Sequence, residues 1–248
     1  MIRLTIAPEP QTFQKEVREP GENVLALLEG KPLPHKLPGR KPSANKKVAG
    51  KDVPKKVEDF PYWTACLDDL HAAYHGICAY YCFYVHRACL PHVDHFVAKQ
   101  DVGKLAAYEW SNYRLACGYA NTCKREFPDV LDPAEVEDGW FQLADLVSLA
   151  VRPDPTLPNE RKAKVTATIQ RLKLQTGRAL EVRQRAMDHF RSGRAGLDFL
   201  AHDHPFLAKE LIRHGITAKE QLPSCPPEVL HRVEPELLAN PAYNDSRS

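Results

Sequence analysis

The chain has 248 residues, of which 43% are hydrophobic and 27% charged, a balance typical of a folded globular protein with one or two domains. The net charge of +2 is too small to identify a partner, and no apolar run approaches the roughly 18 residues that a membrane span needs. Seven cysteines without a secretory signal indicate a reducing, cytoplasmic location, with thiols or metal ligands rather than disulfides.

The first 59 residues are expected to hold little regular structure. Alternating apolar residues predict a short strand at 2–6, and residues 22–28 are compatible with a short helix. Residues 29–59 are rich in proline, lysine and glycine and are expected to form an extended linker. Within them, residues 31–56 carry nine Lys or Arg against one acid. This charge density favours contact with nucleic-acid phosphates, and a plain solubilising linker is the alternative.

A more compact region is expected to begin near Phe60. Apolar residues at helical spacing predict a helix that stops near Gly76. Residues 77–85 then form a strand or a knuckle. Further along, the predicted elements are strands at 92–97 and 112–117, a loop between them at 98–111, and a helix that opens near Ala120.

The last third of the chain is expected to be helical. Residues 127–141 hold five acids and no bases, and they are predicted to be a turn-rich cover. A long helical pattern over 159–191 could break near Gly177, and a helical hairpin follows at 195–215.

These elements predict an α+β protein, mostly helical, with a small core of two strands and a helix at about 77–126. The expected division is an N-terminal segment with its basic linker (1–59), a region that contains the two strands and the helix (60–150) and a C-terminal helical region (151–248).

The chemistry of this core depends on five polar side chains. Asp94 and Asn121 supply the oxygen ligands that a hard divalent ion prefers. His95 can accept a proton from water, because the reference pKa of histidine is about 6.5. Asn112 can hydrogen bond to the backbone at both ends of a loop and so hold the His95 strand in register. Lys124 lies three residues after Asn121, on the same helix face, where it could contact a phosphate or neutralise charge.

Asp94 and His95 are neighbours, and this creates a geometric requirement. Adjacent side chains on a strand point to opposite faces. The strand must therefore end or twist at this dipeptide if both side chains are to face one site.

The segments Val93-Asp94-His95-Phe96, Trp110-Ser111-Asn112-Tyr113 and Asn121-x-x-Lys124 together resemble the HNH endonuclease family. The resemblance covers about residues 78–124. It implies a fold of two strands and a helix around one Mg²⁺ or Mn²⁺, with His95 as general base, Asp94 and Asn121 as metal ligands, and Asn112 as the loop-fixing residue. The stretch 107–117, with 129–133, resembles a branch found in bacterial anti-phage settings, often beside an ATPase partner.

Four cysteines near this core depart from the family pattern. Many HNH proteins bind a structural zinc with two Cys-x-x-Cys pairs, whereas here Cys78 and Cys82 are separated by three residues and Cys117 and Cys123 by five. These thiols could still bind zinc, but we favour the alternative in which Cys78 and Cys117 pack in the core.

The resulting expectation is a metal-dependent endonuclease that hydrolyses DNA and is gated by a regulatory partner. The second hypothesis is a catalytically silent nucleic-acid-binding or assembly module that keeps the HNH-like fold. The departure of the cysteine spacing from the family pattern motivates it. An RNase or tRNA-directed toxin is a third, because the chemistry does not require deoxyribose. The sequence leaves open the target sequence and the oligomeric state.

Overall fold

The computed structural model describes residues 1–36, 57–98, 104–125 and 127–222. This part of the chain contains seven α-helices and two antiparallel sheets of two strands each, so the predicted α+β class is confirmed. The helices are α1 (Glu19–Leu28), α2 (Leu67–Ala73), α3 (Gly118–Lys124), α4 (Asn159–Arg171), α5 (Gly177–Arg191), α6 (Leu197–Asp203) and α7 (Pro205–Arg213). The strands are β1 (His92–His95), β2 (Tyr113–Ala116), β3 (Phe141–Leu143) and β4 (Val151–Pro153).

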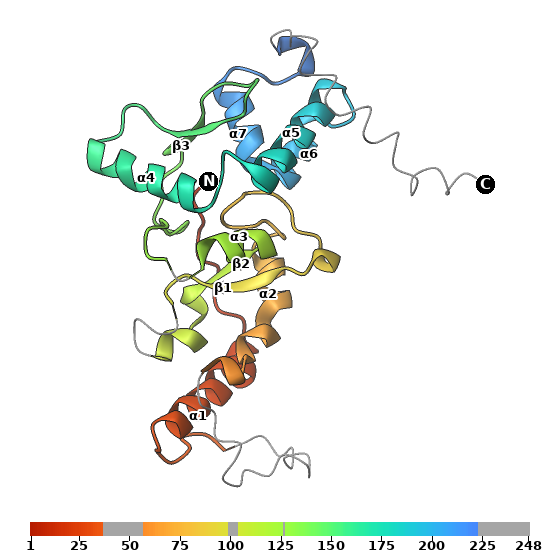
Figure 1. The fold of residues 1–248 in the computed structure, drawn as a ribbon. Coiled ribbons are helices and arrows are strands. Elements are labelled where there is room, and N and C mark those ends of the chain that lie inside the picture. Colours follow the sequence, from red (N-terminus) through yellow and green to blue (C-terminus); the bar gives the residue numbers. More distant parts are fainter. Residues whose placement is uncertain (37–56, 99–103, 126, 223–248) are drawn as a thin grey trace, which may run out of the picture.

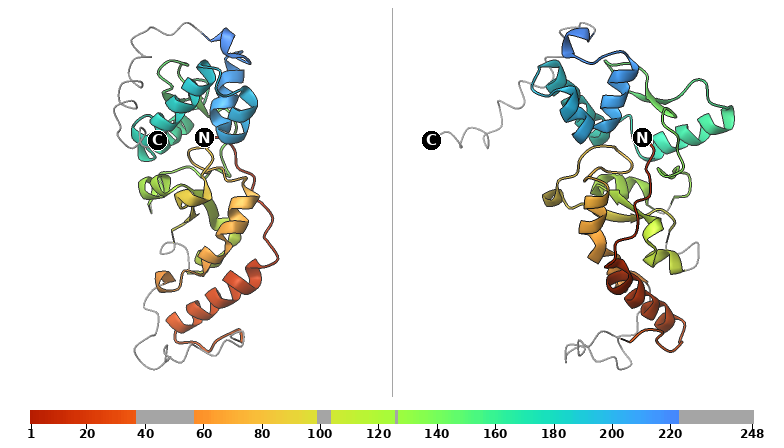
Figure 2. Two further views of the ribbon diagram at one scale, coloured as in Figure 1. Left: turned by 90° about the vertical axis from the view of Figure 1, so that its right-hand side faces the viewer. Right: turned by 180° about the vertical axis from the view of Figure 1, so that it is seen from behind.

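The molecule is elongated, with α1 at one end, the β1–β2 sheet and α3 in the middle, and helices α4 to α7 at the other end (Figure 1). The first residues run along the outside from the C-terminal helices down to α1 (Figure 2). They are extended but form no strand, so the prediction of a strand at 2–6 is wrong: the backbone of Leu4 bonds to the oxygen of Pro133 in a loop instead of to a sheet.

Strands β1 and β2 lie antiparallel, and α3 follows β2 directly. In the strand register His92 faces Ala116, and His95 faces Tyr113. Both strands and the helix were predicted at these places, although each strand is shorter than expected. Cys117 caps α3, because its thiol accepts the backbone N–H of Ala120 at 3.4 Å.

Two hydrophobic clusters meet in this middle part. One joins α1 and the preceding turn, including Phe13 and Val17, to Leu70 on α2 and to Tyr113 and Leu115 on β2. The other joins the segment around Cys78 and Tyr80 to the C-terminal helices. Each side of the β1–β2–α3 unit is therefore packed against a different half of the chain, which fixes the unit without a large sheet of its own.

The C-terminal region follows the helical prediction in part. The long helical pattern breaks as expected, because α4 ends at Arg171 and α5 begins at Gly177, whose φ is +55°. Helices α6 and α7 form the predicted hairpin. The β3–β4 pair was not predicted, because each strand has only three residues and one of them includes Pro153.

One sequence prediction lies largely outside the described residues: the basic segment at 31–56, of which only residues 31–36 are described. None of the helices in the described ranges is long and apolar enough to cross a membrane.

Candidate active site

A cleft of about 690 Å³ opens at the end of β1, and three of the five predicted site residues line it: Asp94, His95 and Asn121. The strand ends at His95, as the sequence argument required. Asp94 and His95 are both buried, with 4% and 8% of their surface exposed, and Asn121 is half-buried one turn into α3. The other residues that line the cleft are Trp63, His92, Val93, Ala98, Arg125 and Phe127.

The imidazole of His95 is held in one orientation. Its Nε2 lies 2.9 Å from the backbone oxygen of Ala107, and the hydroxyl of Tyr113 donates to the same oxygen at 2.7 Å. Because a carbonyl oxygen can only accept, Nε2 carries the proton and the lone pair of the ring is on Nδ1. The rings of Trp63 and Tyr113 pack edge-on against the imidazole, with centroids 4.8 and 5.0 Å away.

Asn112 joins the two ends of the loop between β1 and β2. Its amide oxygen accepts the N–H of Val97 at 2.8 Å, and its amide nitrogen donates to the oxygens of Val97 and Ala106 at 3.1 and 2.9 Å. Ala106 is next to Ala107, whose oxygen positions His95. The asparagine therefore acts on the histidine through the backbone and does not line the cleft.

Asp94 is surrounded by hydrogen-bond donors. The hydroxyl of Tyr80, which is fully buried, donates to Oδ2 of Asp94, and the ammonium of Lys124 lies 3.2 Å from the same oxygen. Burial raises the pKa of the Asp94 carboxyl above its usual value, and Lys124 and the bond from Tyr80 act in the opposite direction. Burial and the nearby carboxylate raise the pKa of Tyr80, so its hydroxyl stays a donor.

Lys124 does not line the cleft, and its ammonium compensates the charge of Asp94, which is the second of the two roles that its position allowed. The residue is 1% exposed, and the ammonium donates to the backbone oxygen of His95 at 2.9 Å in addition to its contact with Asp94. The predicted spacing on α3 is present, but the helix turns this face inward. Lys124 thus neutralises Asp94 in the floor of the cleft.

A buried ion pair beside the cleft was missed by sequence reasoning. Arg114 on β2 donates from Nε and Nη2 to the two carboxylate oxygens of Asp132, at 2.8 and 2.6 Å. Asp132 belongs to the acidic segment for which the sequence predicts a turn-rich cover, but it is only 7% exposed. Tyr80 was missed as well. Neither contact has a local signal, because each joins residues at least 14 positions apart.

The donors at the cleft suit a divalent cation. Asp94 and Asn121 offer one carboxylate and one amide oxygen to the same cleft, and oxygen ligands are those that Mg²⁺ and Mn²⁺ prefer. An ion held there would share Asp94 with the ammonium of Lys124. Among the described residues, no group of three or more His, Cys, Asp or Glu side chains is arranged so that it could hold a metal ion by itself.

The four cysteines considered for zinc lie around α3. Cys78, Cys82 and Cys117 are buried thiols, and Cys123 is half-buried. The thiol of Cys78 accepts the backbone N–H of Cys117 at 3.4 Å, and a hydrogen bond from Cys78 lowers the pKa of the Cys117 thiol. In this arrangement the free thiols of Cys78 and Cys117 form a hydrogen bond with each other and accept backbone N–H groups within the core.

Comparison with known proteins adds no assignment: no protein-family model, no curated protein and no solved structure matches this chain.

Proposed function

We propose that this chain is a metal-dependent endonuclease of the HNH type that hydrolyses DNA phosphodiester bonds in the cleft at the end of β1. The observation that carries the proposal is the convergence of Asp94, His95 and Asn121, from two separate elements, on one cleft. The order of β1, β2 and α3 along the chain agrees with the fold that the sequence resemblance implies.

His95 is the general base of the proposed reaction. With its proton fixed on Nε2 by the oxygen of Ala107, the ring presents Nδ1 as the atom that takes a proton from the attacking water. Asn112 keeps this geometry by tying Val97 to Ala106, so it is a positioning residue.

Asp94 and Asn121 would hold the Mg²⁺ or Mn²⁺ ion, with Tyr80 fixing the orientation of the carboxylate. Such an ion, when bound, stabilises the negative charge that develops on the phosphate and on the leaving oxygen. Lys124 keeps the buried carboxylate compensated and anchors α3 to the end of β1. An anti-phage setting and control by an ATPase or another partner remain predictions from the resemblance.

The test is cleavage of supercoiled plasmid with Mg²⁺ or Mn²⁺, with matched RNA as a second substrate. The wild type is expected to nick DNA, EDTA to abolish nicking, and His95→Ala to reduce the rate at least about 100-fold, in the range that general bases contribute. His86→Ala is the matched control, because His86 is an exposed histidine outside the cleft. Metal-dependent nicking that survives in His95→Ala would remove His95 as the base.

A second candidate function is a catalytically silent nucleic-acid-binding module. The contact between Lys124 and Asp94 favours it, because a cation already compensates the carboxylate that the reaction needs. This candidate predicts that the protein binds DNA but neither nicks it nor binds Mn²⁺ at Asp94. The endonuclease requires nicking and Mn²⁺ binding.

A further inference from the structure

Part of the lining of the cleft comes from exposed residues that follow the end of α3. Arg125 and Phe127 both line the cleft, and both are exposed, Phe127 by 40%. Neither side chain takes part in the proposed chemistry. A single exposed phenylalanine is not informative by itself. Its position in the wall of the cleft beside Arg125 makes its ring accessible to a molecule that enters the cleft.

Arg171, the last residue of α4, covers the ring of Phe127. Its guanidinium carbon lies 3.7 Å from the ring centroid, and its side chain also pairs with Asp129 at 2.9 Å. The stacked guanidinium is therefore held in place before any ligand arrives. Pre-orientation of this kind lowers the entropy lost on binding.

A second arginine stacks on an aromatic ring nearby. Arg178, exposed in the first turn of α5, lies 5.3 Å from the ring centroid of Tyr119 on α3. Tyr119 packs on Tyr81, and the hydroxyl of Tyr81 donates to the backbone oxygen of Leu172 at 2.8 Å. Because Leu172 follows Arg171, a chain of contacts through Tyr81 connects the two stacked pairs.

We call this surface the arginine–aromatic ridge, and its members are Arg125, Phe127, Arg171, Lys173, Arg178 and Tyr119. They carry four positive charges, and Asp129 supplies one negative charge beside Arg171. Guanidinium groups bind phosphates, and flat aromatic or guanidinium faces stack on unpaired bases. An acidic protein partner would use the charges but would have no need of the exposed ring.

We propose that the arginine–aromatic ridge binds a single-stranded segment of nucleic acid and directs it into the cleft. The proposal rests on the proposed function for its location, since the ridge begins in the wall of that cleft. It adds a substrate preference: the scissile strand is engaged next to at least one unstacked base, as at a junction, an overhang or a displaced strand.

The test uses His95→Ala as the parent protein, so that binding is measured without cleavage. Fluorescence anisotropy of a labelled oligothymidylate gives the affinity as a function of salt. Arg125→Glu/Arg178→Glu should weaken binding more than about tenfold at 0.1 M salt, and the slope of log K against log salt should fall by about 0.7 for each lost phosphate contact. Phe127→Ala should weaken single-strand binding about fivefold or more and leave duplex binding nearly unchanged.

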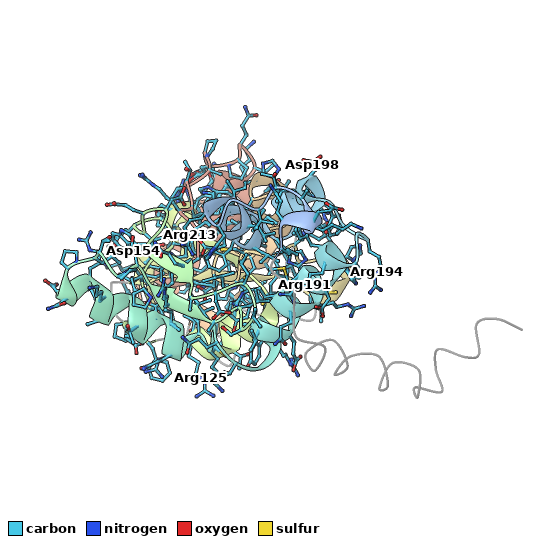
Figure 3. The ribbon with its side chains drawn as sticks, turned by 90° about the horizontal axis from the view of Figure 1, so that it is seen from above. Arg125, Asp154, Arg191, Arg194, Asp198 and Arg213 are labelled. Carbon is cyan, nitrogen blue, oxygen red and sulfur yellow. The ribbon has the colours of Figure 1, made fainter. Side chains whose placement is uncertain are left out.

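The control is Arg194→Glu, a reversal of one charge at an exposed arginine that lies at a different edge of the molecule from Arg125 (Figure 3). Because the ridge variant reverses two charges, the losses of affinity are compared per reversed charge, and Arg194→Glu should weaken binding less than about twofold. Circular dichroism and thermal unfolding of each variant establish that it is folded.

The outcomes separate this proposal from the proposed function. The ridge proposal is overturned if the parent does not bind the oligonucleotide, if the ridge variants bind like the parent, or if Arg194→Glu loses as much affinity as the ridge reversals. Nicking by the wild type in these cases would leave the endonuclease in place. Loss of binding in the ridge variants, with no nicking by the wild type, would support the ridge and overturn the endonuclease.

Discussion

At the residue scale, the side chains that matter most are buried charges held by specific partners. Lys124 and Asp94 form one such pair, with side chains 2% and 4% exposed, and Arg114 and Asp132 form another, with 4% and 9%. Buried charges are costly unless they are paired, so removing one partner leaves the other uncompensated. Each pair therefore gives a stability prediction that its exposed counterparts do not share.

Lys124→Met should destabilise the metal-free protein by roughly 3–5 kcal/mol, because it leaves Asp94 buried without its cation. If Asp94 also binds a divalent ion, Mn²⁺ should stabilise this variant more than it stabilises the wild type. Urea unfolding with and without Mn²⁺ measures both effects. A variant as stable as the wild type in the absence of metal would show that the pair contributes nothing.

Asp132→Asn should cost roughly 3–5 kcal/mol, since the guanidinium of Arg114 would lose the charge of both carboxylate oxygens in a buried site. Asp129→Asn is the control, because its pair with Arg171 is about a third exposed and should be worth at most about 1 kcal/mol. Equal losses of stability in the two variants would contradict the difference that burial is expected to make.

At the element scale, the loop between β1 and β2 depends on one side chain. The side chain of Asn112 forms three hydrogen bonds with backbone groups of this loop, at Val97 and Ala106. Each is worth about 1 kcal/mol of stability net. The loop in turn supplies the oxygen of Ala107 that orients His95. Loss of Asn112 should therefore affect the base even though the asparagine does not line the cleft.

Asn112→Ala should lower stability by about 2–3 kcal/mol and lower the nicking rate more than this loss of folded protein explains. Amide hydrogen exchange at Val97 should become faster, because its N–H loses its acceptor. Ser111→Ala, at the exposed neighbouring residue, should change neither quantity. Unchanged exchange at Val97 in Asn112→Ala would contradict the role assigned to this residue.

Helices α6 and α7 meet at His204, and this junction should respond to pH. Burial lowers the pKa of His204; the carboxylate of Asp203 raises it and His189 lowers it further. Because the folded-state pKa lies below the unfolded value of about 6.5, the unfolded chain binds the proton first as the pH falls. This contribution to stability is complete above about pH 6.5 and is lost as the pH falls from there toward the lower folded-state value.

His204→Gln should accordingly remove part of the loss of stability between pH 7 and pH 5, measured as the free energy of unfolding in urea at each pH. His202→Gln, at the exposed histidine two positions earlier, is the comparison. The junction would not be the source of the pH dependence if both variants followed the wild-type curve.

At the scale of the whole molecule, the sequence predicted the local elements much better than the contacts between them. Strands β1 and β2, helix α3 and the break before Gly177 follow from periodicity and from the positions of polar side chains. The inward turn of Lys124, the bond from Tyr80 to Asp94 and the pair of Arg114 with Asp132 depend on how distant segments pack. Spacing along one helix shows which residues share a face, but not which face is buried.

The same limit explains the two errors in the predicted strands. Residues 2–6 alternate like a strand, but they pair with none of the described strands, and the segment packs as an extended chain against two cores. Strands β3 and β4 pair because the chain between Phe141 and Val151 turns back on itself. A strand of three residues is too short to show an alternating pattern in the sequence, so this pair was not predicted.

The measurement that tests the central claim most directly is a Mn²⁺ titration of the metal-free protein, followed by electron paramagnetic resonance. The account predicts one ion bound per chain, loss of that binding in Asp94→Ala, and weaker binding in Asn121→Ala. Failure of the wild type to bind Mn²⁺, or equal binding by Asp94→Ala, would show that the cleft at the end of β1 is not a metal centre and would contradict the proposed hydrolysis.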